Sequence, residues 1–478
     1  MTMKTEILML RLACGFSLWL AMAGPAAALR LQPVYETGDI KLYGVSVQST
    51  VVDPNGKRAA KPAMQASAVF QLTVLNAMPD GTVKMRLAPV GAVLNGRSLR
   101  TTEQLGPPVV IKLNRAGKVI AVEVPATRYT QARVVDLQPY MSQEWRNTPW
   151  IPQRDLRAGE SWVVKKQDSR LKQSGGEMRV RLASEKESHA GVQCCRFDAT
   201  GSGNVIVEEV MALVAAQPAT GMPQSVAARC REYARDIRGT GALASESQCW
   251  VSLEDAGIVA ASGTSRMAVD ISGGKVLRAK RSALVLESES RLRRLTKDEA
   301  RSFLAAYPQT VAPRLAGLCS EEQGASGPML AATGLRPQTY SAIIVGMSVF
   351  NLLPFPSPLE VIDISFKLHG RLLPDGRDYT NFKLTMGIKV GCSLPFIDFI
   401  SLFVGSGYHL GDMAKSIEAG SSSVGVSLAA LFIGTNFTPS SGEVGLSSSI
   451  VNVSAGYSLS LNVAGVTEHP GIQTDILQ

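Results

Sequence analysis

The amino-acid sequence predicts a mainly β protein with two antiparallel β-rich domains and few short helices. Strict two-residue alternation recurs along the chain. The clearest case is VNVSAGYSLSLNV at residues 451–463, where apolar residues alternate with small or polar ones. Turn-forming groups such as PDG and NRAG separate the alternating stretches. The length of 478 residues exceeds that of one ordinary domain, which predicts at least two cores.

Residues 1–28 have the features of a secretory signal peptide. Lys4 and Arg11 supply positive charge, an apolar run extends to Ala23, and small residues lead to Leu29. The apolar run is short for a membrane span, and an uncleaved anchor is the alternative. We therefore expect an exported protein in the periplasm or cell envelope, with the outer membrane as an alternative location.

Composition divides the mature chain into two parts. The formal net charge is +9, and the positive excess lies before residue 326, whereas the remainder is sparsely charged and slightly acidic. We predict a basic antiparallel β domain at 29–318 (a curved sheet with a helix), a linker at 319–340, and a long-stranded antiparallel β domain at 341–478. The scattered basic residues suit anionic lipid headgroups or a solvated surface without a partner. No dense Lys/Arg cluster indicates nucleic-acid binding.

Hairpins dominate the first domain. The alternating stretch 66–77 is followed by the turn signal MPDGTV, and residues 108–124 form two β-branched runs joined at Asn114–Gly117. Further strands form a meander with turns at 254–257 and 272–275. An antiparallel sheet of consecutive hairpins is therefore expected.

Two helices are expected in this domain. The first spans 126–145 and is broken near Pro139. The second follows Thr296, because Glu299 three residues later completes a capping-box pattern. The apolar residues expected to anchor this second helix on the core are Phe303, Leu304 and Tyr307.

Four motifs in the first domain occur in a recognisable succession. They are FQLTVLNAMPDGTVKMRL, VVIKLNRAGKVIAVEV, LRAGESW and GTGALASESQCWVSLEDAGIVAASGTSRMAVDI. This succession, over about residues 33–290, resembles secreted bacterial domains of unknown function with a LolA/LppX-like curved antiparallel sheet. The resemblance implies a curved sheet that embraces a helix, a fold that shelters lipid acyl chains in some relatives. It implies no site residue.

Long alternating strands characterise the second domain. They lie at 361–373, 381–392, 421–434 and 451–463, and three of them reach the length that crosses a bilayer. Only about five or six strands can be counted, which is fewer than in the smallest single-chain barrels, and no Trp follows Trp250. We predict a sheet or sandwich whose apolar face lies against protein. A membrane barrel, alone or completed by oligomerisation, is the alternative.

Six cysteines follow the signal peptide. We predict a disulfide between Cys230 and Cys249, because a type II′ turn at Gly239–Thr240 would place them opposite each other, with Cα atoms about 5.5 Å apart. The pairing of the other four is left open; these are Cys194, Cys195, Cys319 and Cys392.

No catalytic pattern is found in the sequence. The four histidines have no metal-ligand spacing, and no nucleotide-binding or nucleophile-elbow motif occurs. Glu208 and Glu209 are expected to face apart in a strand. His409, in GSGYHLGD, is the most site-like residue, and Trp150 and Trp162 are expected to anchor the core.

The sequence therefore indicates a non-catalytic envelope protein without a metal or cofactor. The expected partner is a lipid, another apolar ligand or an envelope component. Peripheral membrane contact is also expected, and nucleic-acid binding is not. An outer-membrane barrel or pore-forming protein is an alternative from a different class. A hydrolase with an unrecognised site near His409 is a third.

Overall fold

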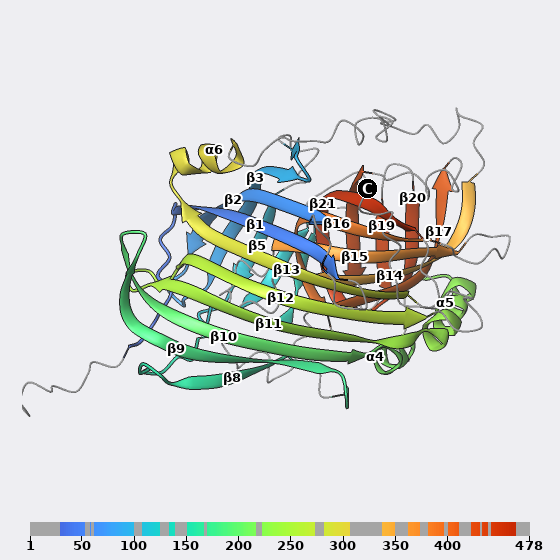
Figure 1. Ribbon diagram of the computed structural model, residues 1–478, viewed down its shortest axis with the longest axis horizontal. Helices are drawn as coiled ribbons and strands as arrows, with labels where there is room; N and C mark the ends of the chain where they lie inside the picture. Colours follow the sequence, from blue (N-terminus) through green and yellow to red (C-terminus); the bar gives the residue numbers. More distant parts are fainter. Residues whose placement is uncertain are drawn as a thin grey trace, which may run out of the picture.

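The computed structural model describes two β-rich regions (Figure 1). The residues it describes are 29–52, 58, 62–99, 108–124, 133–138, 151–166, 170–216, 222–272, 282–305, 337–348, 362–372, 381–395, 400–410, 422–430, 433–437 and 441–464. The expected signal peptide at 1–28, most of the expected linker at 319–340, and Tyr307 lie outside the described residues.

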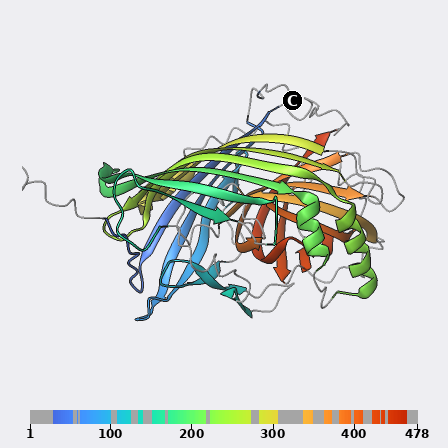
Figure 2. The same cartoon turned by 90° about the horizontal axis from the view of Figure 1, so that it is seen from below.

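A 13-stranded antiparallel sheet forms the larger region. From one edge to the other its strands are β7 (Arg133–Asp136), β6 (Val119–Val124), β5 (Val109–Leu113), β3 (Val83–Leu94), β2 (Met64–Ala77), β1 (Ile40–Val52), β13 (Ser282–Leu295), β12 (Ile258–Ser272), β11 (Arg238–Ser252), β10 (Val192–Ile206), β9 (Gly175–His189) and β8 (Ser161–Lys166). The short strand β4 (Arg97–Leu99) pairs with β3. The predicted mainly β class is confirmed. The sheet curves, so that its long strands arch over the second region (Figure 2).

The two faces of this sheet differ because side chains alternate along each strand. In β11, Leu243, Ser245, Ser247 and Cys249 are buried, whereas the residues between them are exposed. The concave face therefore holds the core and the convex face of β11 meets solvent, as is common for antiparallel sheets.

Two predicted turns of the first domain are confirmed. Between β2 and β3, Asp80 Oδ1 accepts a hydrogen bond from Thr82 N at 2.7 Å. Between β5 and β6, Asn114 Oδ1 accepts one from Ala116 N at 3.0 Å. These short Asp and Asn side chains satisfy backbone donors two residues further on, which explains why they mark turns in the sequence.

The helix expected after Thr296 is confirmed as α6 (Lys297–Ala305). Thr296 N donates to Glu299 Oε2 at 2.8 Å, and Glu299 N donates to Thr296 Oγ1 at 3.2 Å, which is the reciprocal pair of a capping box. Phe303 and Leu304 anchor the helix by apolar packing, but on a separate small cluster on the convex face of the sheet and not on the main core. Their small cluster contains Val69, Leu295 and Ala300.

The helix expected over 126–145 is wrong in its described part. Arg133–Asp136 form the edge strand β7, which pairs with β6. The β-branched pair Val134–Val135 favours this extended conformation. Residues 126–132 and 139–145 lie outside the described residues.

Two helices that the sequence interpretation missed join β10 to β11. They are α4 (Val207–Ala215) and α5 (Gln224–Asp236). Glu208 and Glu209 therefore lie on a helix and not on a strand. The hairpin turn predicted at Gly239–Thr240 is also wrong, because this pair lies inside β11, with Thr240 opposite Ile206.

Eight antiparallel strands of the second region form a closed barrel. Around the ring they are β14 (Pro337–Ser348), β15 (Ile362–Leu372), β16 (Asn381–Pro395), β21 (Ser449–Ala464), β18 (Ser422–Ala430), β19 (Ile433–Phe437), β20 (Ser441–Ser447) and β17 (Ile400–Leu410). β17 pairs with β14 and closes the ring where an open sheet or sandwich was expected. The strand count fell short because β19 has only five residues, and β20 is short and rich in Gly and Ser.

The pairing register sorts the barrel residues into two rows. Apolar residues pair with apolar ones around the ring, as Ile364 with Ile388, Leu384 with Leu461 and Val426 with Ala455. Five buried members of this row join the same core cluster as the large sheet, so the apolar row is the outer face of the barrel. These five are Ile343, Val345, Leu402, Val404 and Leu446.

The other row faces the inside of the barrel. There the buried ring of Phe403 lies against Gly434, where a Cβ atom would come within 2.9 Å of the ring. A Cβ atom on Gly405 would approach the same ring within 2.6 Å. Glu443 and Ser447 are also buried in this row. At this level the interior is filled by side chains, as the diameter of an eight-stranded barrel predicts.

Candidate functional site

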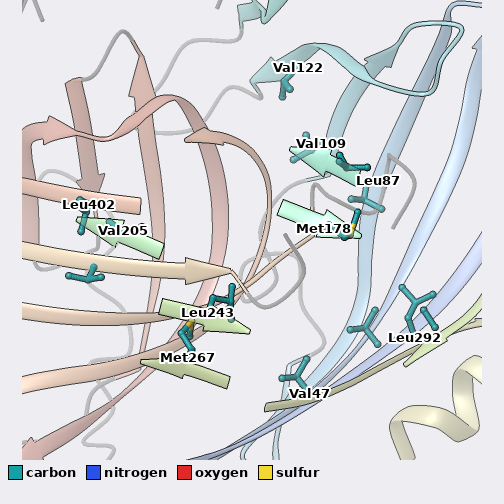
Figure 3. Close-up of a cluster of buried hydrophobic side chains, with 14 of the residues drawn as sticks. Val47, Leu87, Val109, Val122, Met178, Val205, Leu243, Met267, Leu292 and Leu402 are labelled. Atoms are coloured by element: carbon teal, nitrogen blue, oxygen red, sulfur yellow. The ribbon is translucent and has the colours of Figure 1, made fainter. Parts of the chain in front are cut away.

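The concave face of the large sheet carries the most distinctive surface of the described protein. It is apolar at both ends of its long strands. Figure 3 shows Val205, Leu243 and Met267 at the end that meets Leu402 of the barrel, and Leu87 and Leu292 toward the opposite end. We call these the barrel end and the closed end of the concave face. Both ends belong to one buried cluster.

A band of small hydroxyl side chains crosses the sheet between these two ends. We call it the serine band; its members are Ser49, Ser245, Ser247, Ser265, Ser288 and Ser290. The register aligns them across four adjacent strands, β1, β13, β12 and β11. Glycine and alanine extend the band on β10, where Gly201 lies opposite Ser245 and Ala199 lies opposite Ser247. The band is therefore a strip of low side-chain volume on an otherwise bulky apolar face.

Only part of the serine band is satisfied by hydrogen bonds. The hydroxyls of Ser49 and Ser288 lie 2.6 Å apart and bond to each other. Ser290 Oγ donates to the carbonyl oxygen of Gly263 at 3.4 Å. Ser245 and Ser247 are 6% and 7% exposed, and within the described part of the chain their hydroxyls have no hydrogen-bond partner. A buried hydroxyl without a partner is unfavourable, so these two positions are candidates for binding a polar group.

The barrel meets the sheet through its outer row and through α5. Helix α5 packs against β17 and β20, and the Cys230 thiol lies beside the backbone of Ser406 and Leu446. β16 packs against β2 and β3. The two regions form separate sheets, so side-chain packing joins their described strands without a shared strand ladder.

The predicted disulfide is contradicted by the structure. Cys230 is on α5 and Cys249 is in the middle of β11, and both are free thiols. The prediction failed because it assumed a strand at 230–236, where the chain is helical. Cys194 and Cys195 are also free and buried. Of the remaining cysteines, Cys319 and the side chain of Cys392 lie outside the described residues.

Three of these thiols lie near one another at the closed end. Burial raises the pKa of Cys195 to about 12, and burial raises the pKa of Cys249 further, with Cys195 and Cys194 as neighbouring contributors. The nucleophilic form of cysteine is the thiolate, and a raised pKa keeps the side chain as the neutral thiol. These residues therefore behave as apolar core side chains.

A charged cluster secures the β11–β12 turn at this end of the sheet. Asp255 Oδ2 lies 2.6 Å from Lys41 Nζ and 3.1 Å from Arg294 Nη2, and Asp255 Oδ1 accepts a hydrogen bond from Gly257 N at 3.0 Å. Burial acts to raise the pKa of Asp255, but Lys41, Gly257 and Arg294 outweigh it and hold the pKa well below its usual range. Nearby Leu253 and Ala256 line a depression of about 310 Å³. The cluster has a clear structural role in closing the turn between β11 and β12.

The residues considered for catalysis are not brought together. Glu209 accepts backbone hydrogen bonds from Gln173 and Ser174, and Glu208 accepts one from Gly239, so both carboxylates hold chain segments in place. His409 lies at the end of β17, opposite Ser441, and its side chain is outside the described residues.

Trp162 is in edge-to-face contact with Phe197 at 5.9 Å, consistent with a core anchor, and Trp150 lies outside the described residues. Among the residues that the structure describes, no group of three or more His, Cys, Asp or Glu side chains is arranged to hold a metal ion. None of the described helices combines the length and apolar character needed to cross a membrane.

Comparison with known proteins assigns no family to the chain. No family matches its sequence, and no curated protein matches it. A lipovitellin structure, described in terms of lipid–protein interactions, aligns over 55% of this chain but only 26% of its own, at 11% identity and a TM-score of 0.26. OmpF of Salmonella typhi, in complex with daunomycin, aligns over 88% of this chain and 99% of its own, at 8% identity and a TM-score of 0.16.

Both TM-scores are too low to establish a shared fold. The LolA/LppX-like resemblance expected for 33–290 is therefore supported only in its coarser part, a curved antiparallel sheet.

The serine band is the feature that sequence interpretation missed. Its signal was present, because Ser245 with Ser247 and Ser288 with Ser290 each occupy successive positions of a strand face that is otherwise apolar. Single strands with two such serines are common, and only the register shows that they lie side by side across the sheet.

Proposed function

We propose that this chain is a non-catalytic, exported protein of the cell envelope that binds lipid between its curved sheet and its barrel. The observation that carries the proposal is the meeting of two apolar surfaces from separate sheets. Leu243 and Met267 of the concave face and Leu402 of the barrel wall belong to one core. A lipid tail is as apolar as these side chains. It can therefore take the place of one of the two apolar surfaces, and the other surface keeps an apolar neighbour.

Burial of an acyl chain offsets the packing that is lost when this contact opens. Each buried methylene group contributes about 0.8 kcal/mol, so an acyl chain that enters this contact gains several kcal/mol. Because no strand ladder joins the described strands of the two regions, opening the contact breaks side-chain packing and leaves both sheets intact. This separation supports a surface that opens for a ligand.

The proposed function involves no catalysis, because the candidate acid, base and nucleophile side chains have structural roles. Glu208 and Glu209 are bonded to backbone groups, and burial raises the pKa of Cys195. None of these described groups is poised as an acid, base or nucleophile. The scattered positive charge of 29–318 supports contact with anionic headgroups at the envelope surface.

Native mass spectrometry of protein exported and purified without detergent tests this proposal. We expect added mass from a retained lipid. The variant Leu243→Lys, which places a charge on the concave face, should lose that mass, whereas Ala244→Lys on the exposed convex face of the same strand should retain it. Leu243→Ala gives a milder variant in case the lysine prevents folding. Protein that carries no lipid, even after exposure to a lipid extract, contradicts the proposal.

A second function, a membrane-anchored barrel, is favoured by one specific observation. The alternating apolar positions continue by register around all eight strands, whereas the described contacts with the large sheet and its helices involve β14, β16, β17 and β20. In sequence, the other strands carry the two-residue alternation that is typical of strands in a hydrocarbon layer. Fractionation decides between the two functions: a lipid carrier is released with the periplasmic extract, and an anchored barrel follows the outer membrane.

A further inference from the structure

The serine band offers a polar site inside the apolar contact described above. Its two rows run across the concave face and contain no charged residue; the members other than the six serines are Met178, Gly201, Met64, Val180, Ala199, Gly263, Val47 and Ala66. The nearby carboxylates of Glu246 and Glu289 occupy alternate positions, on the convex side. A ligand group on the band would therefore meet hydroxyls and no charge.

Two of these hydroxyls are buried and have unused hydrogen-bonding capacity. Ser245 and Ser247 are next to each other on the same face of β11 and are more than nine-tenths buried. Their Oγ atoms lack a hydrogen-bond partner in the described part of the chain, whereas Ser49 and Ser288 satisfy each other. The unmet hydrogen-bonding capacity is thus concentrated at one end of the band.

We propose that the serine band binds the neutral oxygen-bearing part of a lipid, an ester or hydroxyl group such as that of an acylglycerol, through Ser245 and Ser247. This inference rests on the lipid-binding function proposed above and specifies its ligand. A charged phosphate or carboxylate would be left without a counter-charge in this part of the face, which is costly in a buried site. A neutral ester accepts hydrogen bonds from both hydroxyls and leaves its acyl chains to the apolar ends of the face.

The two hydroxyls have opposite effects on stability and on binding. Without ligand, an unpartnered buried hydroxyl destabilises the fold, so the double variant Ser245→Ala/Ser247→Ala should unfold at a higher denaturant concentration than the wild type. With ligand, the same variant should bind an ester lipid less tightly. If the two serines only filled space, their replacement by alanine would not both raise stability without ligand and weaken binding of the ester lipid.

Displacement of a fluorescent acyl probe from the full mature chain tests the inference, with dioctanoylglycerol and hexadecane as competitors. For the wild type we expect dioctanoylglycerol to compete better than hexadecane. The double variant should lose about tenfold in affinity for dioctanoylglycerol and be unchanged toward hexadecane. Thr264→Ala, at an exposed position on the convex face of β12, is the matched control and should change neither.

The outcomes separate the two proposals. Equal competition by both molecules, unaffected by the double variant, overturns the role of the serine band and leaves lipid binding standing. Failure of the wild type to bind the probe and both competitors overturns lipid binding itself. A double variant that is destabilised without ligand also overturns the inference, because it would show that the two hydroxyls are already satisfied.

Discussion

The large sheet and the barrel use the same two-residue alternation but turn their apolar rows to opposite sides. In the sheet, Leu243 and Met267 point into the concavity. In the barrel, Leu402 and Val404 belong to the outer row and reach the same core from the other side. The periodicity of a strand fixes only that one face is apolar. Whether that face lies inside or outside is decided by closure of the ring and by what packs against it.

The comparison is tested first at the core of the sheet. Phe70 is fully buried on β2, so Phe70→Ala should lower the free energy of unfolding by about 4 kcal/mol through lost burial and the cavity left behind. Tryptophan fluorescence during denaturation measures this, because Trp162 and Trp250 lie on strands of the sheet and no Trp follows Trp250 in the sequence. Val134→Ala, at an edge position 66% exposed, should have little effect. Equal effects of the two variants would contradict the assigned core.

A charge on the barrel wall tests the contact between the two regions. Leu402→Glu should cost about 3 kcal/mol, because a carboxylate would face the apolar concave surface. Tyr408→Glu is the matched control, since Tyr408 shares the strand and the row but is 40% exposed. Chemical denaturation compares the two. If both cost the same, the outer row of the barrel does not lie against the sheet.

The acid stability of the sheet depends on Asp255. Asp255→Asn should cost about 2 kcal/mol at neutral pH, because Lys41 and Arg294 lose a partly buried partner. The pKa of Asp255 is lowered by folding, so its stabilisation is complete above the ordinary aspartate pKa near 4 and declines as the pH falls below that value.

The difference between wild type and Asp255→Asn should therefore shrink in acid. Denaturation at a series of pH values measures it. A difference that grows as the pH falls below 4 would contradict the assigned ion pairs.

The smallest effect is expected at the convex face. Thr296→Ala removes one half of the capping box of α6 and should cost about 1 kcal/mol in the helix alone. Because α6 packs on the side away from the barrel, lipid binding and the sheet–barrel contact should be unchanged. Hydrogen exchange of α6 amides measures the loss. A change in lipid retention would show that the two faces of the sheet are coupled.

Local chemistry was predictable from the sequence, and long-range closure was not. The turns at Asp80 and Asn114 and the capping box at Thr296 depend on residues within four positions of each other. Closure of the barrel depends on β14 finding β17, which are separated by two intervening strands along the chain, and on the brief strands β19 and β20. No local pattern encodes such pairing.

The missed helix α5 had a usable signal. Its buried residues Ala227, Cys230 and Ala234 recur at spacings of three and four, which is the helical period. The alternation that begins in β11 was extended backwards over this stretch, and the false hairpin and the false Cys230–Cys249 bridge both followed from that step. The spacing of apolar residues is helical before Ile237 and alternating after it, and this change of period marks the boundary between the helix and the strand.

Photoaffinity labelling with a diacylglycerol that carries a photoreactive group on its acyl chain tests the central claim most directly. The account predicts cross-links to the concave residues of β11–β13, among them Leu243 and Met267, together with Leu402 of the barrel wall. Labelling confined to the convex face, at positions such as Thr264, or no labelling at all, would contradict it.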